Sequence, residues 1–101
     1  SNALDYVSEK PKIGKFPLWQ SINDNAISNY YGNVFPIAYN LFRQLIHLLN
    51  GTRTRDDLLR ELTSYVNSDD EIEDREELLS NLPQLLDQNL FVLAKMGFLV
   101  G

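Results

Sequence analysis

The chain has 101 residues, of which 44% are hydrophobic and 23% are charged, and its net charge is −5. This length and composition fit one globular domain. Cysteine is absent, which excludes disulfides, thiolate metal sites and a cysteine nucleophile. No apolar run approaches the ~20 residues needed to cross a bilayer. We therefore expect a cytoplasmic protein that makes no contact with a membrane.

The first three residues look foreign to the protein. Ser1-Asn2-Ala3 has the form of a remnant left by a cleaved purification tag, and Met96 is the single methionine. Residues 1–3 are therefore expected to be a tag remnant that does not belong to the domain. We expect the remainder to come from the interior or the C-terminal part of a longer protein.

Residues 4–35 are expected to form an extended arm. Two prolines and a glycine at positions 11–17 interrupt any regular period. Phe16 and Trp19 are the large apolar side chains of the arm, and burying such a side chain contributes about 1.5–3 kcal/mol. The arm therefore either docks on the core or links to a neighbouring domain. Within it, residues 27–35 favour a short strand or a bend.

The first helix is expected over residues 36–50. Pro36 suits the first helical position, because its missing N–H has no partner there in any case. Apolar residues recur at spacings of three and four, which predicts one buried stripe. The stripe consists of Ala38, Leu41, Phe42, Leu45, Leu48 and Leu49. Gly51 should end the helix in the left-handed conformation.

The second helix is expected over residues 54–66. Thr54 is a good N-cap, and Asp57 follows three residues later, a variant of the capping box. The predicted apolar face consists of Leu58, Leu59, Leu62, Tyr65 and Val66. Because the connection to the first helix is so short, the two helices should form a tight corner.

Residues 67–77 are an acidic run, expected to begin as a solvated loop and to lead into a third helix that reaches Met96. Pro83 either kinks this helix or divides it into two. Gly97 should end it, and the next residues, up to Val100, favour a short buried strand. Together these elements predict a mainly α, winged-helix-like domain over residues 36–101, with three or four helices and short β-strands.

The sequence offers no constellation of catalytic, cofactor-binding or metal-ligating residues. His47 is the single histidine and falls on the polar side of the first helix. The acidic run lacks the glycine that a calcium-binding EF-hand loop requires. Neither a dinucleotide-binding glycine motif nor a P-loop occurs, and no serine lies in a G-x-S-x-G motif. We therefore expect this chain to have no catalytic activity of its own.

A winged-helix fold raises the question of DNA binding. The third helix would offer Gln84, Gln88, Asn89 and one cation, Lys95, directly after the acidic run. DNA-binding proteins neutralise phosphates with clustered Lys and Arg. We therefore expect no nucleic-acid partner, and a transcription regulator is the weaker alternative.

One segment resembles a known family. Residues 45–62 read LIHLLNGTRTRDDLLREL, which resembles the L-x-x-L-L-D-G-T-R-D-R-x-x-L-L block of the bacterial methyltransferase regulatory domain. The KPK and FPL triplets of the arm, with the ISN triplet at 27–29, resemble the arm and the V-T-N step that precede this block. Residues 90–100 resemble its L-x-x-L-A-x-x-G-L-L close. Asn50 stands where the block commonly has Asp.

The resemblance implies an accessory or regulatory domain that follows the catalytic domain of an S-adenosylmethionine-dependent, protein-lysine-type methyltransferase. The implied partners are the catalytic domain of the same chain and a protein substrate. S-adenosylmethionine would bind in the parent protein's upstream domain, so no cofactor is expected in this chain. The candidate interaction surface consists of Phe16, Trp19, Arg53 and Arg55.

A second reading stays open. Similar L-D-G-T-R-T turns occur in winged-helix modules that resemble the peptide-binding chaperone of pyrroloquinoline quinone maturation. A peptide-binding adaptor of this kind would need an exposed strand edge that an incoming peptide could join. Residues 27–35 or 98–100 could supply that edge.

Overall fold

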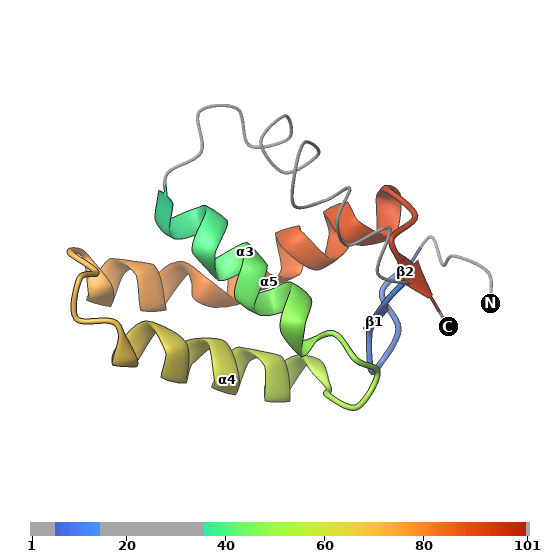
Figure 1. The fold of residues 1–101 in the computed structure, drawn as a ribbon, viewed down its shortest axis with the longest axis horizontal. Helices are drawn as coiled ribbons and strands as arrows, with labels where there is room; N and C mark the ends of the chain where they lie inside the picture. Colours follow the sequence, from blue (N-terminus) through green and yellow to red (C-terminus); the bar gives the residue numbers. More distant parts are fainter. Residues whose placement is uncertain (1–5, 15–35, 101) are drawn as a thin grey trace.

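A computed structural model of the chain describes residues 6–14 and 36–100, with side chains for 6–14 and 40–100. The fold is mainly helical with a small antiparallel sheet, as expected (Figure 1). The elements in chain order are β1 (Lys12–Ile13), α3 (Pro36–Leu48), α4 (Arg55–Ser68), α5 (Arg75–Lys95) and β2 (Leu99–Val100). The predicted strand at 27–35 lies outside the described residues. No helix in the described part of the chain is long and apolar enough to span a membrane.

Helix α3 follows the prediction closely and ends two residues early, at Leu48. Most of the predicted stripe that the structure describes is buried, namely Leu41, Phe42, Leu45 and Leu49. Ile46 is also buried, with 4% of its surface exposed, although it was not assigned to the stripe. The buried face is wider than predicted because α3 packs against both other helices.

Helix α4 begins at the predicted cap. The Thr54 hydroxyl accepts a hydrogen bond from the backbone N–H of Asp57 at 3.2 Å, and the Asp57 carboxylate accepts one from the Thr54 N–H at 3.0 Å. This reciprocal pair is the predicted capping box and satisfies two otherwise unpaired donors. The helix buries Leu58, Leu62 and Val66.

Helix α5 is continuous, so Pro83 lies inside one helix and does not divide it. Gly97 ends the helix with a φ of 79°. The Gly97 N–H donates to the carbonyl of Ala94 at 3.1 Å, and the Phe98 N–H donates to that of Leu93 at 2.9 Å. This pair of bonds is a Schellman motif, which confirms the predicted role of Gly97 as the helix stop.

The loop between α4 and α5 is better anchored than the acidic sequence suggested. Ile72 is buried in it, with 8% exposure, and belongs to the hydrophobic core. The Arg75 guanidinium donates to the backbone carbonyls of Val66 at 3.3 Å and Asp69 at 2.5 Å. The same two carbonyls also accept hydrogen bonds from the backbone N–H groups of Asp69 and Ile72, so Arg75 adds a second set of bonds that ties the loop to the end of α4.

Part of the N-terminal arm belongs to the folded domain. In β1, Lys12 is paired with Val100 and Ile13 with Leu99. The other edge of β1 is bonded to the corner between α3 and α4: Ile13 N–H donates to the Leu49 carbonyl at 2.9 Å. Strand β1 therefore lies between this corner and β2. The arm is anchored by Pro11, which is fully buried, and by the partly buried Ile13.

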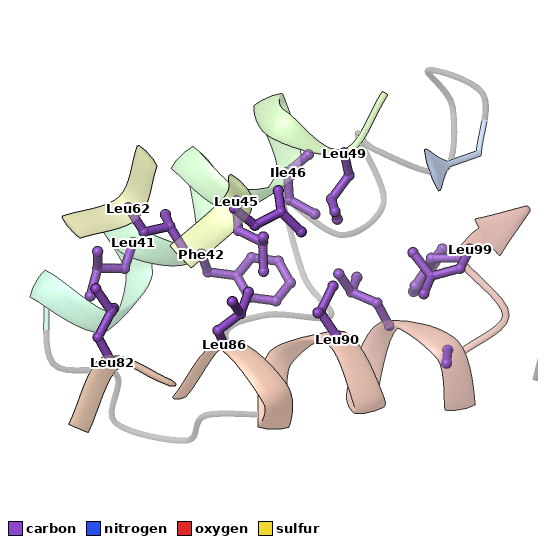
Figure 2. Packing of buried hydrophobic residues seen from close by; sticks show 14 of the residues in the cluster. Leu41, Phe42, Leu45, Ile46, Leu49, Leu62, Leu82, Leu86, Leu90 and Leu99 are labelled. Carbon is purple, nitrogen blue, oxygen red and sulfur yellow. The ribbon is translucent and has the colours of Figure 1, made fainter. Parts of the chain in front are cut away.

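The core lies where the three helices meet (Figure 2). Side chains of α3 point toward those of α5, and Leu62 of α4 and Leu99 of β2 join the same cluster. The α5 members are Leu82, Leu86, Leu90, Leu93 and Ala94. This packing fixes the corner and the sheet at one end of the molecule, and the α4–α5 loop at the other (Figure 1).

Candidate functional site

The corner between α3 and α4 is held by its own short-range hydrogen bonds. The Asn50 side-chain oxygen accepts from the backbone N–H of Thr52 at 3.0 Å and from its hydroxyl at 2.6 Å. Gly51 has a φ of 85°, a conformation that L side chains rarely adopt, and its N–H donates to the Pro11 carbonyl at 3.1 Å. The corner is thus bonded directly to the N-terminal arm.

Arg53 connects the two helices at this corner. One of its guanidinium nitrogens donates to the carbonyl of Leu48, the last residue of α3, at 3.0 Å. Its Nε donates to the carboxylate of Glu61 on α4. The side chain is 27% exposed. Arg53 therefore caps α3 and ties it to α4.

Arg55 connects α4 to α5. Its Nε and Nη2 donate to the two carboxylate oxygens of Asp87, at 2.6 and 3.1 Å. This two-point geometry is the strong form of an arginine–carboxylate pair. The hydrogen bond that Arg55 donates to Asp87, followed by the negative charge of Asp87, raises the pKa of Arg55 above its ordinary value.

A shallow groove of about 730 Å³ runs beside this ion pair. Its lining combines the N-terminal segment, the start of α4 and the C-terminal half of α5. The lining residues are Val7, Ser8, Glu9, Pro11, Thr54, Arg55, Asp56, Asp87, Leu90 and Phe91. The groove contains an apolar surface and several carboxylates.

Phe91 is the aromatic residue among those that line the groove, and it is 58% exposed. Its neighbours along α5, Leu90 and Val92, are buried. Val7, on the arm, is 39% exposed and lines the same groove. The Lys95 ammonium lies 5.4 Å from the centroid of the Phe91 ring, which is within range of a cation–π interaction.

The described residues contain no cluster of three or more His, Asp or Glu that could hold a metal ion. His47 is exposed on α3, beside a second hollow of about 360 Å³ that Lys12 and Asn50 also line. The arrangement within the described ranges is suited to binding and offers no acid–base constellation.

The predicted site residues are only partly brought together. Arg55 lines the groove, and Arg53 lies at the corner facing Glu61. Phe16 and Trp19 lie outside the described residues. Both arginines bind carboxylates of their own chain, so their predicted role as partner contacts stays a prediction.

Sequence reasoning missed Phe91 and Asp87 as groove residues. A signal for Phe91 was present: it falls at helical spacing from Gln84, Gln88 and Lys95, on the polar side of α5. A phenylalanine on a polar helix face indicates a surface contact more than a core position. The pairing of Asp87 with Arg55 spans 32 residues and left no local signal.

No family model, curated protein or solved structure matches the chain. The resemblance to the methyltransferase regulatory domain therefore stays a prediction.

Proposed function

We propose that the chain is a non-catalytic accessory domain of a larger S-adenosylmethionine-dependent methyltransferase, where it packs on the catalytic domain or helps to hold a protein substrate. The observation that carries the proposal is the α3–α4 corner. Residues 50–55, the turn within the block on which the resemblance rests, make up this corner, and each of their polar side chains has a defined place there or in the groove beside it.

The departure from the block at Asn50 is compatible with the proposal. Asn50 acts through its side-chain oxygen, which accepts both hydrogen bonds from Thr52. An aspartate at this position would offer the same acceptor. The exchange of Asp for Asn therefore preserves the turn on which the corner depends.

A small sheet beside the helical corner is compatible with the winged-helix-like arrangement that we propose. Here Asn50, between α3 and α4, forms a bridge with Lys12 of β1, and β1 pairs with β2, which follows α5. The N-terminal arm supplies β1, which lies between the single bridge to Asn50 and β2.

The same sheet also bears on the peptide-binding adaptor. An adaptor of that kind would add a peptide to a free strand edge. Strand β1 uses both of its edges, toward the corner and toward β2. Strand β2 pairs with β1 along one edge, and its other edge has no strand partner within the described residues, so a peptide-binding adaptor stays the second candidate.

The coding sequence that precedes Leu4 tests the proposal. We expect it to encode a strand, a glycine-rich loop and a helix of the kind that binds S-adenosylmethionine. A start codon directly before Leu4 would contradict the proposal. A gel shift with DNA over a range of salt concentrations would then separate a DNA-binding protein, whose affinity falls as salt rises, from an adaptor.

A further inference from the structure

The groove beside the Arg55–Asp87 pair combines an apolar surface with several carboxylates. Its floor includes Pro11 and Leu90, which are buried, and its wall presents the exposed ring of Phe91. Single exposed apolar residues are common on proteins. Here the exposed ring and Val7, which come from two segments of the chain, line one shallow groove, which is the form of a docking site for an apolar side chain.

The rim of the groove is acidic. Three carboxylates line it, those of Glu9, Asp56 and Asp87, against the single guanidinium of Arg55. Arg55 engages both oxygens of Asp87 and lies 3.7 Å from a carboxylate oxygen of Asp56. The Asp56 side chain is 84% exposed, and Glu9 is exposed and has no ion pair within the described ranges. The uncompensated charge is therefore negative.

Charge complementarity indicates which kind of side chain the groove would bind. A cationic side chain would be attracted to Glu9 and Asp56, whereas an acidic one would be repelled. The position of Lys95 over the Phe91 ring shows that a cation is accommodated beside this aromatic surface. An apolar side chain next to the cation would cover Phe91 and Leu90.

We propose that this groove binds a short protein segment in which a basic side chain adjoins an apolar one. The basic residue pairs with Glu9 and Asp56, and the apolar residue packs on Phe91. The inference rests on the protein-binding role proposed above and names the chemistry of the partner. It does not depend on methylation.

A fluorescence-anisotropy titration with defined peptides tests the groove. The probe is a fluorescein-labelled peptide of sequence GSLKFKLSG, compared with GSLEFELSG, which reverses its charge, and GSSKSKSSG, which removes its apolar side chains. We expect saturable binding of the first peptide. We expect at least about tenfold weaker binding of each of the other two, because one deleted anchor contact of about 1.4 kcal/mol changes an affinity tenfold.

Variants assign the binding to the groove. Phe91→Ser should weaken binding of GSLKFKLSG about tenfold, and the double variant Glu9→Gln/Asp56→Asn should weaken it and reduce its dependence on salt. Met96→Ser is the matched apolar control, since Met96 is 40% exposed and does not line the groove. Asp70→Asn/Glu71→Gln is the matched acidic control, in the loop at the other end of the molecule. Both controls should bind as the parent does.

Three results would overturn the inference: no saturable binding of GSLKFKLSG, equal binding of the acidic peptide, or equal losses in the controls. Sedimentation velocity on the chain alone tests whether a second copy of the chain occupies the groove. If the chain forms a dimer that is lost in Phe91→Ser, the occupant of the groove is another copy of this chain and not a basic peptide, which overturns the inference. Because the titration contains no S-adenosylmethionine, its failure overturns the groove assignment alone, whereas the proposed function is tested by the upstream coding sequence and by methyl transfer in the full-length protein.

Discussion

The guanidinium of Arg55 donates two hydrogen bonds, of 2.6 and 3.1 Å, to the carboxylate of Asp87, which lies 32 residues further along the sequence. The pair joins the first residue of α4 to the middle of α5, beside the groove. It therefore fixes the relative position of two walls of the candidate binding surface. Both side chains remain substantially exposed, at 44% and 55%, so the pair is expected to orient these walls more than to stabilise the fold.

The Arg55–Asp87 pair should behave as one coupled unit. Arg55→Ala, Asp87→Ala and the double variant should each lower the Tm slightly and by similar amounts, and salt should reduce the effect. Circular dichroism melts at low and high salt measure this. Arg60→Ala, which removes a more exposed arginine of the same helix, is the control. Additive losses in the double variant would show that the two residues act separately.

The cap of α4 should make stability depend on pH in the acid range. Hydrogen bonds from the Thr54 backbone N–H and hydroxyl, together with Arg60, lower the pKa of Asp57 below its ordinary value. A carboxyl with a depressed folded-state pKa contributes stability that is fully present above its unfolded pKa, about 4. That contribution is lost as the pH falls through the folded-state pKa.

The variant Asp57→Asn should therefore have a lower Tm than the parent near neutral pH, and the difference should shrink as the pH falls from about 5 toward 2. Thermal melts across this range measure the difference. Thr54→Ser retains the capping hydroxyl and should keep the pH profile of the parent. A difference between Asp57→Asn and the parent that stays constant down to pH 2 would contradict the assignment.

Gly51 should tolerate substitution poorly. Its φ of 85° costs an L-residue about 1–2 kcal/mol. An added Cβ would also lie 3.3 Å from the Cδ atom of Lys12. Gly51→Ala is therefore expected to destabilise the protein by about 1–2 kcal/mol in urea unfolding. Gly51→Asn should cost less, because asparagine enters this conformation more readily. Equal stability of Gly51→Ala and the parent would refute the account of the corner.

Ile72 should be a stability determinant despite its acidic surroundings. Truncating a buried isoleucine to alanine typically costs 2–5 kcal/mol. Since Ile72 is 8% exposed at the edge of the core, Ile72→Ala is expected at the lower end, about 2 kcal/mol in urea unfolding. The control is Glu71→Ala, at the exposed neighbouring residue, and the free energy of unfolding is expected to change by no more than about 0.5 kcal/mol. Equal effects of the two variants would show that the loop is not anchored.

The helices could be read from the sequence because their signals are local. Thr54 and Asp57 form a capping box over three residues, and Gly97 forms a Schellman stop within five. The leucine spacing of α5 likewise places Leu82, Leu86 and Leu90 on one face. Each of these features depends on residues within about one or two helical turns.

The remaining features depend on contacts between distant segments. Strand β1 has two residues, and its pairing with β2 joins positions nearly a full chain length apart. The burial of Ile72 follows from the packing of α4 against α5, which no period within the acidic run encodes. The groove likewise needs Val7, Arg55 and Phe91 to come together from three segments, so its existence could not be inferred from any one of them.

Methyl transfer by the full-length polypeptide tests the central claim most directly. The measurement compares kcat/KM for a protein substrate, and binding of S-adenosylmethionine, in the full-length protein and in a version that ends before residue 4 of this chain. An accessory domain predicts that S-adenosylmethionine binding is retained and that kcat/KM for the protein substrate falls at least about tenfold, the effect of losing one or more anchoring contacts. Unchanged methyl transfer in the version that lacks this domain would contradict the account. Loss of S-adenosylmethionine binding in that version would contradict it as well.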